Sequence, residues 1–326
     1  MTQTPPRPAI DRERRANTPD EALSRLREQI GSVFLGDPEA IDAILRCLLA
    51  RGHMLIEDVP GVGKTLLAHT VAASIDAEFG RIQLTPDLLP SDVVGVTVID
   101  QESGEWHLRK GPIFANIVLA DEINRTTPRT QSAMLEAMND ASVSIDGHVH
   151  ELEQPFMVIA TQNPYEFEGT YPLPENQLDR FLMRISVGYA SPEAEAELLQ
   201  VRPATTRLPE ITPVISRDEV RTLQQAADEV SLDDALRTYI VELARATRDH
   251  PDVSVGISTR GAMALAQAAR ATALLDGRDY CTPDDILGNL TSVCAHRLFL
   301  HGGGDPSHSG TTRILDEVSR SVAVPE

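Results

Sequence analysis

The chain has 326 residues, of which 41% are hydrophobic, and its formal net charge is −20 at pH 7. This length can hold roughly two domains, each with its own apolar core. Mixed charges and the lack of any run of about 18 apolar residues argue against a membrane-inserted protein. The acidic balance would repel a polyphosphate backbone, so it disfavours DNA or RNA as the main partner and favours a protein partner.

Neither the first residues nor the cysteines indicate export. Residues 1–20 contain prolines and arginines but no apolar segment of the kind that a secretory signal needs, and we expect them to form a disordered tail. Cys47, Cys281 and Cys294 are far apart in the sequence, which fits neither a disulfide framework nor a close-spaced metal site. We therefore expect buried thiols in a reducing, cytoplasmic environment.

From residue 21 onward, short apolar runs alternate with helical patterns, which is typical of a parallel sheet covered by helices on both faces. Two helices precede the first strand, and Asp37, Pro38 and Glu39 begin the second of them as cap, preset first residue and acidic first turn. The expected strands are 53–57, 81–84, 117–120, 155–161 and 184–187. The expected helices between them are 64–75, 129–139 and 175–181.

Two stretches interrupt this alternation. Residues 94–107 and 142–152 each alternate around a turn signal, and each predicts a β-hairpin inserted into the α/β unit. Later in the chain we expect helices with no strand between them. Their patterns cover 193–201, 217–230, 234–250, 260–275 and 283–298. The predicted domains are an α/β domain at 21–205, a helical domain at 206–301, and a flexible connector and tail at 302–326.

A glycine-rich loop lies between the strand at 53–57 and the helix that follows. Its sequence, with the start of the helix, is Asp58-Val59-Pro60-Gly61-Val62-Gly63-Lys64-Thr65-Leu66. Gly61 and Gly63 let successive N–H groups face one anion, and the helix N-terminus adds its positive dipole end. Lys64 would reach the β- and γ-phosphates of a nucleotide, and Thr65 would offer its hydroxyl to Mg²⁺. Residues 60–66 are therefore predicted to bind ATP.

The loop departs from the phosphate-loop pattern at its first position, where Asp58 replaces glycine. Aspartate tolerates left-handed backbone conformations better than most residues, so the turn can survive. A carboxylate that points inward would weaken phosphate binding. Lysine occurs only at Lys64 and Lys110 in a chain rich in arginine, which indicates that position 64 needs an ammonium group. The alternative explanation is an ordinary turn between a strand and a helix.

Two further strands end in polar side chains. Asp121 and Glu122 close the strand at 117–120, at the edge where α/β sheets bind ligands. Asp121 would hold magnesium through its water shell, and Glu122 would polarise the attacking water. Asn163 follows the strand at 155–161 and can orient that water. Taken alone, the acid pair is equally consistent with a solvated strand end, and Asn163 before a proline is typical of an ordinary loop.

The order of these motifs resembles that of AAA+ ATPases, since it continues with Leu178-Asp179-Arg180-Phe181 and then Ser258-Thr259-Arg260. Longer stretches, at 81–92, 120–125 and 160–164, resemble the MoxR family of these ATPases. The similarity extends from about residue 21 to the tail. It implies ATP binding and hydrolysis by a P-loop α/β core with two hairpin inserts and a helical lid.

The resemblance also implies roles for particular residues. The hairpins match the helix-2 insert and the pre-sensor insert, and Asn163 takes the sensor-1 position. Arg180 matches the arginine that reaches the γ-phosphate bound by a neighbouring subunit, and Arg260 matches the sensor-2 arginine of the lid. Residues 33–36 lie where relatives contact adenine, although core packing is the better explanation of such apolar side chains. Other candidates for the arginine that acts on the neighbour are Arg125, Arg129 and Arg184.

An arginine that acts on a neighbour requires a ring, and the resemblance implies a hexamer of this chain. Members of the family act as chaperone-like factors on protein clients, often with partners that carry a von Willebrand factor type A domain. Three other functions remain open: a magnesium chelatase-like or helicase-like motor, a P-loop small-molecule kinase, and a non-catalytic binding module. The kinase would need neither Asn163 nor the lid, and the binding module would not keep Glu122.

Overall fold

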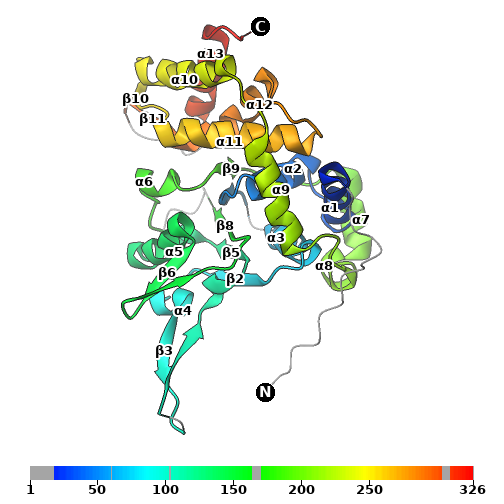
Figure 1. Ribbon diagram of the computed structural model, residues 1–326, viewed down its shortest axis with the longest axis vertical. Helices are drawn as coiled ribbons and strands as arrows, with labels where there is room; N and C mark the ends of the chain where they lie inside the picture. The colour runs from blue at the N-terminus through cyan, green and yellow to red at the C-terminus, as the bar shows by residue number, and fades with distance from the viewer. Residues whose placement is uncertain (1–17, 60, 103, 164–169, 303–308, 326) are drawn as a thin grey trace.

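A five-stranded parallel sheet forms the centre of the molecule (Figure 1). The computed structural model describes residues 18–59, 61–102, 104–163, 170–302 and 309–325. The strands lie in the order β2-β5-β8-β1-β9, and every neighbouring pair is parallel. They are β1 (Met54–Glu57), β2 (Phe79–Gln83), β5 (Ile117–Asp121), β8 (Met157–Gln162) and β9 (Met183–Ile185).

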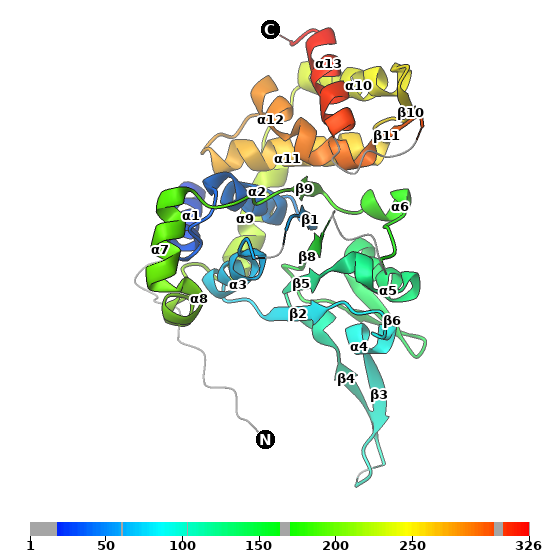
Figure 2. The same cartoon turned by 180° about the vertical axis from the view of Figure 1, so that it is seen from behind.

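Helices cover both faces of the sheet, because successive strand side chains point to opposite sides. Ile56 and Leu119 belong to one buried cluster, which the helices α1 (Pro19–Val33), α2 (Pro38–Leu49) and α3 (Lys64–Ser74) complete. Leu55 and Val118 belong to a second cluster on the other face, with α4 (Pro90–Val94) and α5 (Pro128–Asp140). Figures 1 and 2 show these two layers from opposite sides.

The first helices begin at caps that the sequence signals. The Asp37 side chain accepts a hydrogen bond of 2.9 Å from the N–H of Glu39 at the start of α2, as predicted. Thr18 caps α1 in the same way, at 3.3 Å from the N–H of Glu21. The helix therefore includes residues 19 and 20, which were predicted as the end of the disordered tail. Residues 1–17 lie outside the described part of the chain.

Both predicted hairpins are present. The first consists of β3 (Gly95–Ile99) and β4 (Trp106–Lys110), and the second of β6 (Ser142–Ile145) and β7 (His148–Glu151). The first hairpin projects away from the sheet (Figures 1 and 2). Its apolar side chains are exposed: Ile99 is 52% accessible and Trp106 69%. This hairpin therefore adds little to the core of the chain.

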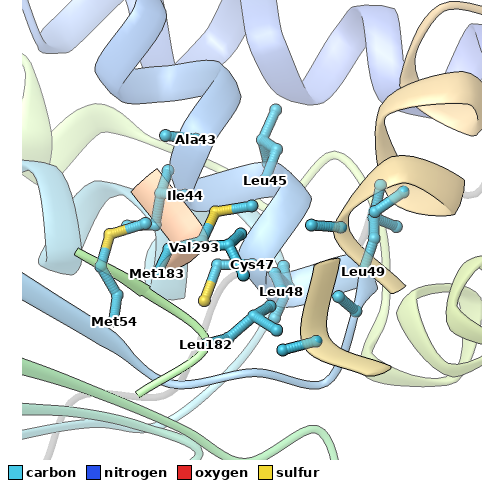
Figure 3. Packing of buried hydrophobic residues seen from close by; sticks show 14 of the residues in the cluster. Ala43, Ile44, Leu45, Cys47, Leu48, Leu49, Met54, Leu182, Met183 and Val293 are labelled. Carbon is cyan, nitrogen blue, oxygen red and sulfur yellow. The ribbon is translucent and has the colours of Figure 1, made fainter. Parts of the chain in front are cut away.

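A helical lid follows the sheet. Short connecting helices, α6 (Glu175–Leu178), α7 (Pro192–Val201) and α8 (Pro203–Thr206), precede its main helices, α9 (Arg217–Glu229), α10 (Asp234–Asp249), α11 (Thr259–Leu275) and α12 (Pro283–Cys294). Figure 3 shows Val293 of α12 packed among Ile44 and Cys47 of α2 and Met183 of β9. The lid and the sheet thus share one hydrophobic cluster, and the predicted α/β core with hairpins and helical lid is confirmed.

Two predictions for the end of the chain were wrong. The lid contains a short antiparallel pair, β10 (Val253–Val255) and β11 (Phe299–Leu300), although no strand was expected there. The predicted tail contains the helix α13 (Ser309–Ser321), which buries Ile314, Leu315 and Val318 against the lid. Its apolar residues recur at helical spacing, but the preceding glycine-rich segment favoured a tail. Residues 303–308, part of the expected connector, lie outside the described ranges.

The burial of the cysteines agrees with the sequence. Cys47, Cys281 and Cys294 are free and buried. Within the residues that the structure describes, no group of three or more histidine, cysteine or acidic side chains is arranged to hold a metal ion. In the same part of the chain, no helix is both long and apolar enough to cross a bilayer.

If α13 is an integral part of the lid, Ile314→Ala should lower the free energy of unfolding by about 2–4 kcal/mol, because it leaves a cavity at a fully buried position. Thermal denaturation followed by circular dichroism would measure the loss as a lower melting temperature. Arg320→Ala on the exposed side of the same helix is the matched control and should change little. Equal melting temperatures for the two variants would contradict this role of α13.

Candidate functional site

The glycine-rich loop has the backbone that phosphate binding requires. Gly61 and Gly63 have φ values of 93° and 91°, which a residue with a Cβ adopts only with strain. Gly63 is also the N-cap of α3, and a Cβ there would lie 3.2 Å from the ring of Phe34. The loop thus curls directly into the helix N-terminus. Pro60 lies outside the described residues.

The Lys64 side chain binds the backbone of this loop. Its Nζ donates to the carbonyl oxygens of Asp58 at 2.9 Å and of Val59 at 3.3 Å. Burial lowers the pKa of Lys64, and the negative charges of Asp58, Asp121 and Glu122 oppose that shift. The ammonium group is therefore close to the two acidic residues that the sequence placed at the end of another strand.

Three hydrogen-bond donors fix the Asp58 carboxylate. Its Oδ2 accepts hydrogen bonds from the N–H groups of Val187 at 2.7 Å and Gly188 at 2.8 Å, and from the hydroxyl of Ser186 at 3.0 Å. These donors follow β9, so Asp58 ties the phosphate loop to the segment that leads into α7. The aspartate at this position therefore makes hydrogen bonds that a glycine could not make, and the sequence did not reveal them.

Asp121 lies at the carboxyl end of β5, between two donors. Thr161 of β8 donates its hydroxyl to Oδ1 at 2.7 Å, and the Arg81 guanidinium of β2 lies 2.7 Å from Oδ2. The Thr161 Oγ1 also accepts from the N–H of Glu122 at 2.9 Å. Strands β2 and β8 flank β5 in the sheet, so three adjacent strands fix this one carboxylate.

Glu122 has a left-handed backbone, with φ 60° and ψ 55°, immediately after β5. For a side chain with a Cβ this conformation is uncommon and marks a constrained position. Its Oε2 accepts from Gln83 Nε2 at 3.1 Å and pairs with Arg125 Nη1 at 3.1 Å. These contacts fix the direction of a carboxylate that is 28% exposed.

One cavity of about 790 Å³ brings these groups together. Its polar wall contains Asn163 as well as the loop and acid residues, namely Gly61, Val62, Gly63, Lys64, Thr65, Leu66, Asp121 and Glu122. Its apolar wall includes Phe34, Leu35, Leu198 and Leu208. Phe34 is only 3% exposed and also belongs to the core. The same side chain therefore packs in the core and lines the cavity.

Arg180 and Arg260 lie elsewhere. They line a second cavity of about 330 Å³, and in the described part of the chain the two cavities share no lining residue. The Arg180 Nη1 donates to the Leu135 carbonyl at 2.5 Å, and the Arg260 Nη2 donates to Asn139 at 3.1 Å. Arg180 precedes β9, so it lies at the amino edge of a parallel sheet whose carboxyl edge carries the phosphate loop.

The other candidate arginines differ in their surroundings. Arg125 pairs with Glu122 of the same chain. Arg184 on β9 lies 3.5 Å from Glu57, and its side chain is only 11% exposed. Arg129 is exposed at the start of α5. The Arg125 side chain is also 43% exposed, so exposure separates Arg125 and Arg129 from the enclosed Arg184.

Sequence reasoning missed several contributors to the large cavity, among them Arg81, Gln83 and Thr161. A signal was present, because Ile82 is buried between exposed Arg81 and Gln83, as alternation along a strand predicts. The parallel register places Gln83 opposite Asp121. The pairing of β2 with β5 joins residues about forty positions apart, so a local pattern does not reveal it.

Comparison with known proteins gives the family of the chain. Residues 53–183 match the model of the ATPase family associated with various cellular activities (AAA), and residues 245–318 match the model of the AAA lid domain. The chain is 48% identical over 303 residues to the uncharacterized protein YeaC of Bacillus subtilis, covering 93% of this chain and 95% of that protein. It is 38% identical to Chaperone MoxR1 of Mycobacterium tuberculosis, covering 93% and 82%, and 30% identical to Protein MoxR of Paracoccus denitrificans, covering 91% and 94%.

The fold agrees with a solved structure as well. A crystal structure of a protein from Cytophaga hutchinsonii, 36% identical, superposes with a TM-score of 0.86 over 94% of this chain and 96% of that one. Fold, cavity and family models together define an ATPase domain of the AAA type with its lid. Within that class, the chain belongs to the MoxR family of AAA+ ATPases, which confirms the resemblance of its motifs.

If Asp58 anchors the loop, Asp58→Ala should lower the free energy of unfolding by about 1.5–3 kcal/mol, because three donors lose a charged acceptor. ATP affinity should fall as well, since the loop loses its tie to the segment after β9. Thermal denaturation and fluorescent-nucleotide titration would measure the two effects. Asp87→Ala, at an exposed aspartate outside the cavity, is the control. Unchanged stability and affinity in Asp58→Ala would contradict the anchor.

Proposed function

We propose that this chain binds ATP in the large cavity and hydrolyses it to ADP and phosphate. The observation that supports this most strongly is convergence: the phosphate loop, the Asp121-Glu122 pair and Asn163 come from three strands and line one cavity. An ordinary turn at residues 58–65 would not need acidic and amide side chains opposite it. The glycine geometry at the start of α3 supports the binding of phosphate in particular.

The side chains around Lys64 suit Mg²⁺, which prefers oxygen ligands and keeps several waters. Thr65 offers a hydroxyl and Asp121 a carboxylate, and both line the cavity. The contacts of Asp121 with Thr161 and Arg81 keep its carboxylate in place. When bound, the ion would neutralise negative charge on the phosphate oxygens.

The remaining polar groups have separate tasks in this proposal. Lys64 exchanges its two carbonyl acceptors for phosphate oxygens, which are stronger acceptors because they are charged. Glu122 takes a proton from the attacking water as general base, and its bonds to Gln83 and Arg125 direct the carboxylate. Asn163 orients the same water and donates to the γ-phosphate.

Arg180 and Arg260 act on the nucleotide of a neighbouring subunit. Their place in the second cavity, at the opposite edge of the sheet from the phosphate loop, supports this assignment. Arg51, Arg270 and Arg297 also line that cavity, so it is rich in positive charge although the chain carries a net charge of −20. Such a pocket suits the terminal phosphate bound by another copy. Repetition of this contact gives a ring, for which we propose a hexamer.

The work of the ring is the remodelling of a protein client in the cytoplasm. The relative named Chaperone MoxR1 supports a chaperone-like role. The exposed apolar side chains of the β3–β4 hairpin offer a surface for protein contact. A partner with a von Willebrand factor type A domain belongs to the same proposal. The acidic charge continues to disfavour nucleic acid as the client.

Glu122→Gln should lower ATP turnover at least about 100-fold, because a neutral amide cannot accept the proton of the attacking water. ATP affinity should stay within about threefold of the unaltered value, since the side-chain shape is kept. Phosphate release and nucleotide titration measure the two quantities. Glu136→Gln, an exposed change on α5, serves as the matched control. Unchanged ATP turnover in Glu122→Gln would contradict the role of Glu122 as general base.

Arg180→Ala should lower kcat about 1000-fold while the KM for ATP changes little, because the arginine stabilises charge that develops in the transition state. Arg129→Ala, at the exposed rival on α5, should change kcat less than about twofold. Steady-state kinetics at a protein concentration where the ring forms would compare the two. A large loss of kcat in Arg129→Ala, with little change in Arg180→Ala, would assign the role in the neighbouring site to Arg129.

A further inference from the structure

Arg297 of the lid is almost completely enclosed. It follows α12 and is 5% exposed. Its guanidinium has five N–H groups, and five oxygen acceptors surround it. These are the carboxylate Oδ1 and the carbonyl of Asp179, and the carbonyls of Phe181, Leu182 and Val293. No surface ion pair explains such an environment, because four of the five acceptors are backbone carbonyls.

Four of these acceptors belong to one short turn, residues 179–182, which carries Arg180. The bond lengths are 2.8 Å from Nε to the Asp179 Oδ1, 3.2 Å and 2.8 Å from Nη2 to the carbonyls of Asp179 and Phe181, and 3.1 Å from Nη1 to that of Leu182. His296 adds a contact of 3.0 Å from Nε2 to the Phe181 carbonyl. The lid therefore holds the backbone on both sides of Arg180.

Core packing also holds this turn, because Phe181 and Leu182 are buried and the N–H of Leu182 donates to the His53 carbonyl at 2.8 Å. The helix α6 before it has only four residues and no buried side chain, and the carbonyls of Gln177 and Leu178 accept from the N–H groups of Arg180 and Phe181. Arg297 supplies donors to the carbonyls that follow the helix, those of Asp179, Phe181 and Leu182. Removing Arg297 would leave buried carbonyls without donors, and the backbone that carries Arg180 would relax.

Arg297 also contacts the helix that carries Arg260. A Cβ at Gly261 of α11 would lie 3.0 Å from the Arg297 Cδ, so the glycine makes room for the arginine stem. Arg260 is adjacent to Gly261 in the chain, and both Arg180 and Arg260 line the second cavity together with Arg297. One buried side chain thus connects the turn that carries Arg180 to the lid helix that carries Arg260.

We propose that Arg297 is a positioning residue that transmits the position of the lid to Arg180 and so sets hydrolysis in the neighbouring subunit. The inference rests on the proposed role of Arg180 in the neighbour's site. Arg297 touches the backbone of the turn and makes no contact with the large cavity. It acts through Arg180 alone or with Arg260, and movement of the lid displaces the turn. Lysine cannot replace it, because a single ammonium lacks the planar fork that binds several carbonyls.

Mixed rings of two full-length chains test this proposal. The acceptor chain carries Arg180→Ala and keeps its own loop and Glu122; the donor chain carries Glu122→Gln and keeps Arg180. Each chain alone should be slow, whereas the mixture should recover turnover at acceptor sites that face a donor. No recovery would overturn the role of Arg180 in the neighbour, and the role of Arg297 with it.

Arg297→Lys is then placed in either chain. In the donor it should lower the recovered kcat at least about tenfold with little change in KM, because a misplaced catalytic group costs rate and leaves binding intact. In the acceptor, whose Arg180 is already absent, it should have little effect on the recovered kcat. Equal recovery with Arg297→Lys in the donor, or equal loss in both chains, would overturn the inference while leaving the proposed function intact.

Two controls separate positioning from folding. Arg278→Lys in the donor changes another lid arginine, which binds both oxygens of Asp285 at 2.7 Å and 2.6 Å, and it should leave the recovery unchanged. Asp179→Ala in the donor removes one partner of Arg297 at a side chain that is 25% exposed, so it retains the fold more readily. It should lower the recovered kcat in the same direction as Arg297→Lys. Full recovery with Asp179→Ala, when Arg297→Lys does not fold, would also contradict the proposal.

Discussion

Parallel strands share one direction, and this constraint decides where each functional side chain of the chain lies. Residues that directly follow β1, β5 and β8 meet at the carboxyl edge of the sheet, which brings the phosphate loop, the acid pair and Asn163 to one cavity. A residue that comes shortly before β9 lies near the amino edge. Arg180 is in that position, so the same topology that assembles the large cavity also keeps Arg180 out of it.

Two cavities thus lie at opposite edges of one sheet. The carboxyl edge is rich in hydrogen-bond donors and acids around Lys64, and the amino edge collects arginines in an otherwise acidic protein. The shared hydrophobic cluster joins the lid to the sheet, and Arg297 joins the lid to the turn before β9. Under the proposed function, a nucleotide that shifts the lid of one subunit would act on the site of the next.

The elements with local signals were predictable from the sequence. The strands, the loop with Gly63 and Lys64, and the cap of α2 each depend on residues close together in the chain. The hydrogen bonds of the Asp58 carboxylate were not predictable from the sequence, because their donors lie almost 130 positions later. The pair β10 and β11 was missed for the same reason, since each strand is short and its partner is distant.

In the candidate site as well, some features were predictable from local sequence and others depend on the tertiary fold. The acid pair could be placed by its position after a strand, whereas its partners Arg81 and Thr161 come from neighbouring strands that only the sheet order brings together. The contacts of Arg297 could not be found, because five acceptors around one guanidinium require the packing of lid against core. Sequence patterns thus locate chemical groups, and the tertiary fold decides which of them cooperate.

We propose that a complete catalytic site forms only between two copies of this chain. The most direct test is the ATPase activity per subunit as a function of protein concentration, followed in parallel by analytical ultracentrifugation. The account predicts that activity per subunit rises with the fraction of assembled chain and is nearly lost in the monomer. Constant activity per subunit down to concentrations where sedimentation shows only monomer would contradict it.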